Sequence, residues 1–137
     1  RSHLLAQDRY DMDRFILTGQ IPATQLVGIL SLSDLHIYLT VPFVLSWSLM
    51  DSLAVGCTVL ASDTAPVREV IKHEQTGLTA GFYDIDELAR QALRVLEDPV
   101  QFRHLGLAGT QLIDEQYSLV KKLPEMLDLY QRTVSKG

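Results

Sequence analysis

The sequence contains a single cysteine, Cys57, among its 137 residues. A disulfide framework and a zinc site built from cysteines are therefore both excluded. The sequence also lacks any run of about eighteen apolar residues, so no segment is expected to span a membrane. No cationic start followed by an apolar stretch marks a signal peptide. Together these absences are typical of a protein from a reducing compartment, and we expect a cytoplasmic location.

Basic residues are also in short supply: 12 Lys and Arg stand against 17 Asp and Glu, for a net charge of −5. Because no block of five or six basic residues occurs, nucleic-acid binding is not expected. The sequence has no G-x-G-x-x-G, no G-x-x-x-x-G-K-[ST] and no G-x-S-x-G, which argues against a dinucleotide fold, a P-loop and a serine hydrolase. The four histidines show no metal-ligand spacing, so no metal is expected and no general base is nominated.

What the sequence does contain is 47% hydrophobic residues, arranged as short apolar runs that alternate with amphipathic stretches. Strands are predicted at four of these runs: residues 15–18, 35–40, 57–61 and 77–80. Helices are predicted at residues 23–30, 49–54, 66–71 and 84–97, then around 102–113, and finally from about 123 to 134. Gly56 is expected to end one helix in the left-handed conformation, and Pro66 to be the first residue of another. Pro124 is expected in the first turn of the last helix.

This order of elements predicts a Rossmann-like α/β fold, a doubly wound parallel sheet with helices on both faces. Four strands are few for such a sheet, and the chain opens with Arg1 instead of Met. We therefore expect a fragment that lacks its first strands. In sheets of this kind ligands bind beyond the carboxyl ends of the strands, which here means residues 19–22, 40–48 and 62–66.

Residues 40–51 form the most unusual of these stretches, because they follow a strand, contain the only tryptophan and open a helix. Ser46 or Ser48 can cap that helix and leave several backbone N–H groups free at its positive end. Such a terminus attracts a phosphate without any lysine. Asp51 could then accept two hydrogen bonds from a sugar diol.

The same residues have structural interpretations that stay open. Ser48 and Asp51 have the spacing of a capping box, in which the carboxylate only returns a hydrogen bond to the helix start. A tryptophan such as Trp47 is more often a core or interface residue than a ligand contact. In the turn after the third predicted strand, Asp63 or Thr64 can cap a helix, and residues 68–69 read as a solvated face or a local ion pair.

Five blocks resemble, in order, the C-terminal domain of group 1 glycosyltransferases, the retaining family of GT-B architecture. The likeness runs from about Phe15 to about Tyr130, and its most specific block is P-F-V-L-S-W-S-L-M-D-S-L-A-x-G-C at residues 42–57. The other blocks are residues 15–22, 33–40, 61–71 and 76–78. The resemblance implies that residues 1–137 are a nucleotide-sugar-binding domain whose N-terminal acceptor domain is absent.

The resemblance also implies a donor site. Backbone groups at Gln20 and Ile21 would hold the base, and Leu45, Ser46 and Trp47 the diphosphate. Asp51 stands where the family has its second motif glutamate, which grips the ribose hydroxyls. No cofactor or metal is implied besides the nucleotide-diphosphate sugar itself.

The sequence departs from the family pattern at the first motif glutamate, whose place is taken by Phe43. Phenylalanine cannot make a carboxylate's contacts to the transferred sugar, although P-F-V-L-S-W-S recurs in a subgroup of the family and Phe43 then reads as a variant solution. Asp51 is also one methylene shorter than glutamate. The basic residues that neutralise the diphosphate in the family lie earlier in the domain and are absent from this sequence.

From the resemblance we expect the donor-binding half of a bacterial glycosyltransferase that builds polysaccharide or glycolipid. Its acceptor, a glycan or a lipid, would be bound by the missing domain, which leaves open a peripheral contact with the inner membrane. The fragment alone is expected to be inactive, to expose apolar surface at its cleft and its last helix, and to self-associate through that surface. The alternatives are a non-catalytic nucleotide-sugar-binding or partner-binding module, motivated by Phe43 and the charge of −5, and a response-regulator-like domain, for which only Asp63 is suitably placed.

Overall fold

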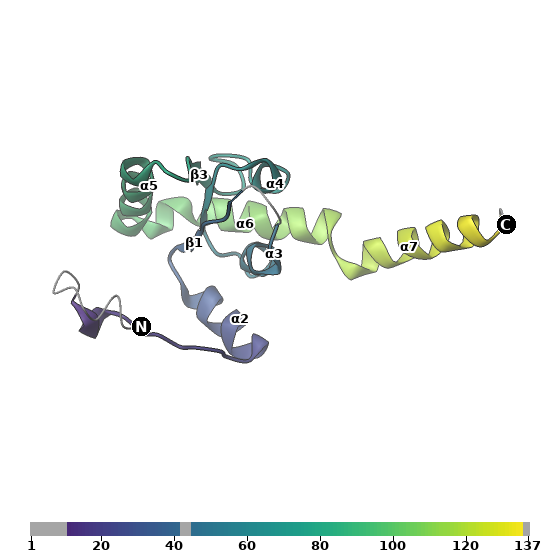
Figure 1. Ribbon diagram of the computed structural model, residues 1–137, viewed down its shortest axis with the longest axis horizontal. Helices are drawn as coiled ribbons and strands as arrows, with labels where there is room; N and C mark the ends of the chain where they lie inside the picture. Colours follow the sequence, from purple (N-terminus) through teal and green to yellow (C-terminus); the bar gives the residue numbers. More distant parts are fainter. Residues whose placement is uncertain (1–10, 42–44, 136–137) are drawn as a thin grey trace.

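Figure 1 shows the arrangement of helices and strands in a computed structural model, which describes residues 11–41 and 45–135. In chain order the elements are η1 (Met12–Arg14), α2 (Ala23–Leu32), β1 (His36–Tyr38), α3 (Trp47–Ala54), β2 (Val59–Ser62), α4 (Ala65–Arg68), β3 (Leu78–Ala80), α5 (Ile85–Glu97), α6 (Pro99–Gln116) and α7 (Leu119–Val134). Strands and helices alternate from β1 to α5, as the sequence predicts.

Among the described residues the sheet has three parallel strands, in the order β1-β2-β3. In register, His36 faces Val59 and Leu60 faces Leu78. All four residues of β2 are buried, as expected for a central strand covered on both faces. The Rossmann-like α/β fold predicted from the sequence is therefore confirmed.

The predicted strand at residues 15–18 is wrong. These residues form no strand, and Figure 1 shows them running apart from the sheet. A strand needs a neighbour for its backbone hydrogen bonds, and apolar character alone does not supply one. Ile16 is consequently 89% exposed.

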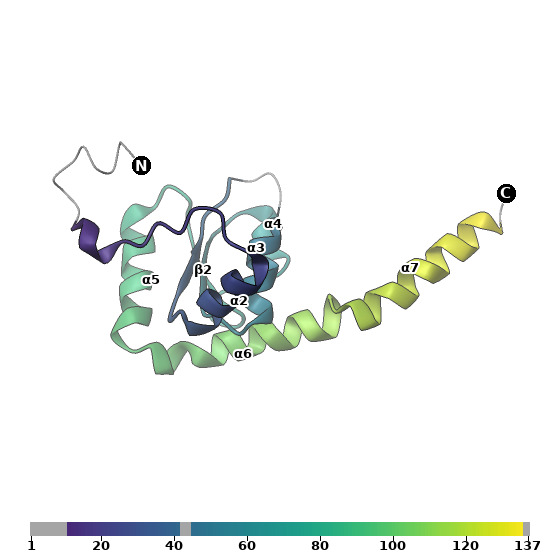
Figure 2. The ribbon, with the colours of Figure 1, turned by 90° about the horizontal axis from the view of Figure 1, so that it is seen from below.

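Two hydrophobic clusters lie on opposite faces of β2, because successive side chains of a strand point to opposite sides. Val59 and Ala61 pack with α3, α4 and the second half of α6. Leu60 packs with β3, α5 and the first half of α6. Figure 2 shows α6 running along one end of the sheet, where it contributes to both clusters.

Side-chain caps and one glycine set several helix ends. Asp84 Oδ1 accepts the Glu87 N–H at 3.0 Å and begins α5, and Asp98 does the same for α6. Gly56 has φ of +79° after α3, which confirms the predicted left-handed end. Pro66 is the second residue of α4 rather than the first, and α4 ends at Arg68.

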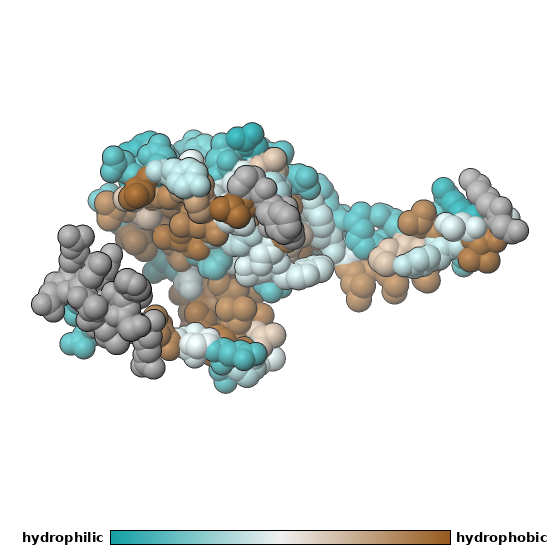
Figure 3. Space-filling model, in the orientation of Figure 1, coloured by the Kyte–Doolittle hydropathy of each residue, from teal (hydrophilic) through white to brown (hydrophobic). Residues whose placement is uncertain are grey.

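The last helix differs from its prediction. Pro124 is the sixth residue of α7, and not in its first turn, because the helix already begins after Ser118. No described residue of α7 is buried, so water can solvate the Val120 carbonyl that a proline leaves without its N–H. Figure 3 shows hydrophobic side chains along one side of this projecting helix. Within the described ranges, none of the helices combines the length and the hydropathy needed to cross a membrane.

Candidate anion site at the start of helix α3

The candidate site lies where β1 ends and α3 begins. Ser46 is the N-cap of α3, with an extended backbone, and its Oγ accepts the Ser48 N–H at 3.2 Å. The Ser46 carbonyl accepts the Leu49 N–H at 3.1 Å. These bonds start the helix in the way expected of a serine cap.

Fewer amides are free here than the sequence predicts. The N–H of Ser46 donates to the Tyr38 hydroxyl at 3.0 Å, and those of Ser48 and Leu49 donate to Ser46. Among the described residues, none accepts a hydrogen bond from the Trp47 N–H. The expectation of several unpaired N–H groups is therefore wrong. What the helix start offers is one amide, the Ser46 and Ser48 hydroxyls, which are 3.1 Å apart, and the positive end of the helix dipole.

Asp51 lies one turn further along α3 and is exposed. The capping-box interpretation is wrong, because Ser46 and not Ser48 is the N-cap, and the Ser48 N–H donates to the Ser46 hydroxyl. No hydrogen bond joins the Asp51 carboxylate to another described residue. The carboxylate is thus available to a ligand from solvent.

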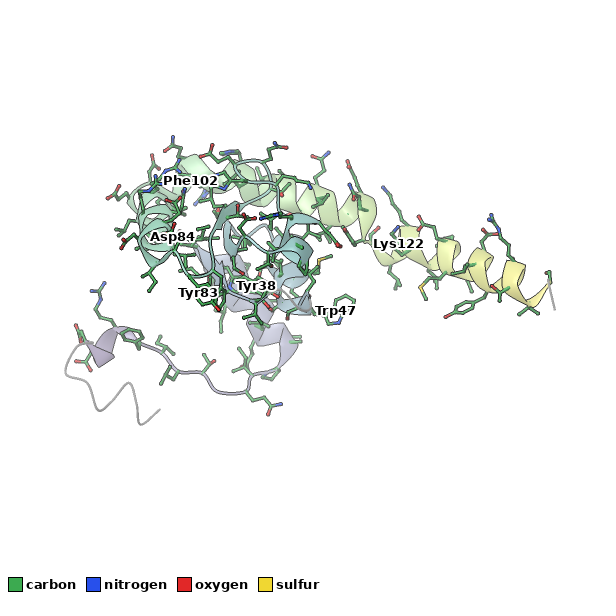
Figure 4. All side chains as sticks on the ribbon, turned by 45° about the horizontal axis from the view of Figure 1, so that its top comes forward. Tyr38, Trp47, Tyr83, Asp84, Phe102 and Lys122 are labelled. Atoms are coloured by element: carbon green, nitrogen blue, oxygen red, sulfur yellow. The ribbon has the colours of Figure 1, made fainter. Side chains whose placement is uncertain are left out.

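Trp47 is the first residue of α3, and its side chain is 81% exposed. The interpretation as a core residue is therefore wrong. Figure 4 places Trp47 at the margin of the body, on the side from which α7 extends, whereas Tyr38 lies within the body. An exposed indole beside a helix start is a natural contact for a ligand or a partner.

A largely apolar groove of about 540 Å³ opens beside the helix start. It is lined by Leu45, Ser46, Trp47, Met50, Tyr117, Leu119 and Lys122. Three of the predicted site residues are thus gathered on one wall. The residues of the opposite wall come from the end of α6 and the start of α7, and no motif in the sequence points to them.

Gln20 and Ile21 immediately precede α2, whose N-cap is Pro22. Gln20 is exposed and Ile21 is half-buried. Helix α2 packs against α3, but no hydrogen bond between described residues joins Gln20 or Ile21 to α3. Their role as base contacts stays a prediction. The prediction about Phe43 lies outside the described residues.

The turn after β2 forms the neighbouring part of this edge of the sheet. Arg68 donates two hydrogen bonds to the Asp63 carboxylate, at 2.6 and 2.9 Å, which lowers the pKa of Asp63. This confirms the predicted local ion pair for Arg68. Thr64 is the N-cap of α4 but makes no side-chain cap bond, and its buried hydroxyl has no partner among the described residues. Throughout the described ranges, no three His, Cys, Asp or Glu side chains gather to hold a metal.

Comparisons with known proteins point in one direction. The family model of glycosyl transferases group 1 matches residues 1–111. The chain is 24% identical, over 126 residues, to N-acetyl-alpha-D-glucosaminyl L-malate synthase of Bacillus anthracis. That alignment covers 92% of this chain and 32% of that protein. It is also 24% identical, over 124 residues, to 2-deoxystreptamine glucosyltransferase of Streptomyces kanamyceticus, with 90% of this chain and 32% of that protein covered.

The structure is similar to that of sucrose-phosphate synthase from Thermosynechococcus elongatus, with a TM-score of 0.81 and 26% identity. The match covers 91% of this chain and 31% of that one. The chain therefore spans about a third of the length of each of these relatives.

Proposed function

Because the chain belongs to the group 1 glycosyltransferases and forms a GT-B domain of that family, we propose that it is the donor-binding half of a retaining enzyme. The enzyme transfers a sugar from a nucleotide-diphosphate sugar to a glycan or lipid acceptor. The observation that carries this proposal is the start of α3, where no described residue accepts a hydrogen bond from the Trp47 N–H and where Asp51, one turn further along, is exposed.

In this proposal the diphosphate lies against the start of α3. The Trp47 N–H donates to a phosphate oxygen, and the pair of Ser46 and Ser48 hydroxyls adds one further donor, because one of the two donates to the other. The helix dipole favours the negative charge and does not require a lysine. In a chain of net charge −5, this is the local feature that best suits an anion.

Asp51 completes the nucleotide contact. Its carboxylate accepts hydrogen bonds from the two ribose hydroxyls, each of which is a donor. Gln20 and Ile21 hold the base through their backbone, as the family resemblance implies.

The contribution of these residues to the reaction is electrostatic. The bond between the anomeric carbon and the β-phosphate oxygen breaks, and a bond to the acceptor hydroxyl oxygen forms with the anomeric configuration kept. The proton of the acceptor hydroxyl passes to the leaving diphosphate. The leaving diphosphate gains negative charge, which the Trp47 N–H and the α3 dipole stabilise. The acceptor is bound by a part of the enzyme outside this chain, so the chain alone binds donor without turnover.

Trp47 provides the test, because it is the only tryptophan. Its fluorescence, excited at long wavelength, is followed while UDP, ADP or GDP is added to the purified protein. A saturable change with at least one of the three is expected. Asp51→Asn should raise the Kd about tenfold, the value of a hydrogen bond to a charged group, whereas Asp114→Asn on exposed α6 surface should leave it unchanged. Absence of any saturable change, or equal affinities for the two variants, would contradict the proposal.

A further inference from the structure

Besides the Ser46 hydroxyl, the Tyr38 hydroxyl is the side-chain group among the described residues that accepts an amide hydrogen bond at the start of α3. Tyr38 is the last residue of β1 and is 8% exposed. Its ring packs in the cluster that contains Leu49, Leu53 and Val59. Its hydroxyl accepts the Ser46 N–H at 3.0 Å.

From this geometry we infer that Tyr38 is a positioning residue for the diphosphate. The bond fixes the backbone of Ser46, and Ser46 is joined directly to the Trp47 amide that would donate to a phosphate oxygen. The inference rests on the proposed function, and it assigns Tyr38 a role that acts through Ser46 and not by contact with the ligand.

A second buried hydroxyl holds the backbone on the strand side of the site. Ser62, at the end of β2, is fully buried. Its Oγ donates to the Thr40 carbonyl at 2.8 Å and accepts the Thr40 N–H at 2.9 Å. Both backbone groups of Thr40 are thus hydrogen-bonded to the central strand β2. The Tyr38 hydroxyl of β1 makes the corresponding hydrogen bond to Ser46. Side chains from two strands therefore fix the backbone at Thr40 and at Ser46.

The physical gain is pre-organisation. A tyrosine ring locked in a core places its hydroxyl at a fixed point, and a donor amide held in advance loses less entropy when a ligand binds. Ser46 is exposed, so water can replace the hydroxyl if it is removed. Loss of this bond should therefore weaken the affinity for the diphosphate much more than it lowers the stability of the fold.

The experiment compares two ligands, UDP and uridine, by Trp47 fluorescence of the purified protein. The Kd for uridine divided by the Kd for UDP measures what the diphosphate adds to binding. In Tyr38→Phe this ratio is expected to fall about fivefold, the value of one neutral hydrogen bond, while the midpoint of thermal unfolding stays within about 4 °C. Tyr83→Phe is the matched control, because Tyr83 is 88% exposed and loses the same hydroxyl away from the site; its ratio should equal that of the wild type.

The outcomes separate this inference from the proposed function. If the wild type binds neither UDP, ADP nor GDP, the proposed function fails and the inference fails with it. If the wild type binds UDP, and the ratio of the uridine Kd to the UDP Kd in Tyr38→Phe equals that of the wild type, only the inference is overturned. This includes the case in which both Kd values rise by the same factor. Should Tyr38→Phe not fold, amide exchange of Ser46 in the wild type decides: protection supports the bond, and exchange at the rate of an unstructured peptide overturns it.

Discussion

Helices α6 and α7 follow one another and have similar lengths, 18 and 16 residues, but only α6 is part of the core. Helix α6 buries Phe102, Leu105, Gly106 and Gly109. None of the described residues of α7 is buried, although seven of its apolar side chains fall on or near one stripe: Leu119, Val120, Leu123, Met126, Leu127, Tyr130 and Val134. A periodic apolar stripe therefore predicts a helix, but burial requires a surface that fits against it.

The fit of α6 depends on its glycines. A Cβ on Gly106 would lie 2.1 Å from the carbonyl oxygen of Gly56, and one on Gly109 would lie 2.8 Å from the Leu53 side chain. The backbone of α6 thus approaches the turn after α3 directly. Helix α7 has no glycine.

The two helices differ in their polar contacts as well. The Thr110 hydroxyl of α6 donates to the Leu53 carbonyl at 3.1 Å, and the Thr58 hydroxyl donates to the Phe102 carbonyl at 3.3 Å. The ion pairs of α7 within the described residues join the helix to itself, as between Lys122 and Glu125. Helix α6 is therefore coupled to the sheet, and α7 is not. The exposed apolar face of α7 agrees with the expectation of apolar surface there, while self-association stays a prediction.

Among these predictions, Gly106→Ala is expected to have the largest effect on stability, because it disrupts the packing that distinguishes α6 from α7. The added methyl group meets backbone atoms of Gly56 that cannot rotate away, so α6 must move off the α3 turn. We expect a loss of about 4 kcal/mol in the free energy of unfolding, above the usual range for overpacking, measured by urea denaturation. Gly28→Ala is the control, because nothing lies within 4 Å of a Cβ there and alanine favours an exposed helix. A loss below about 1 kcal/mol for Gly106→Ala would show that the close approach is dispensable.

One leucine from each helix tests the difference in burial between α6 and α7, with a smaller expected effect. Leu105 of α6 is 1% exposed and Leu127 of α7 is 52% exposed. Leu105→Ala should cost about 3 kcal/mol, because it removes buried methyl groups and leaves a cavity. Leu127→Ala should cost less than about 0.5 kcal/mol. Equal losses in urea denaturation would mean that α7 is packed in solution and that the contrast between the helices is false.

The sequence predicts the central part of the fold well because the signals there are local. The alternation of strands with helices and the apolar run at residues 57–61 are signals that act within a few residues, and the structure confirms both. The strand predicted at 15–18 fails because strand formation depends on a neighbour, which apolar composition does not reveal.

The site divides in a similar way. Leu45, Ser46 and Trp47 are consecutive, so a single helix start brings them together. The second wall of the groove, with Tyr117 and Lys122, lies far along the chain. The bond from Ser46 to the Tyr38 hydroxyl depends on how the ring packs in the core. Such long-range contacts follow from packing and carry no motif of their own.

The smallest effect on overall stability is expected from Pro124→Ala in α7. Alanine restores the N–H that can bond to the Val120 carbonyl, and the local helix gains about 3 kcal/mol. Because no described residue of α7 is buried, this gain should stay within the helix: amide exchange around Val120 slows, while the free energy of unfolding of the body changes by less than about 0.5 kcal/mol. Pro99→Ala is the matched control, since Pro99 is the first residue of α6, where proline suits the helix and the substitution adds no such bond. A rise of about 2 kcal/mol in the unfolding of the body with Pro124→Ala would mean that α7 and the core unfold as one unit, because a local gain reaches the body only through packed contacts.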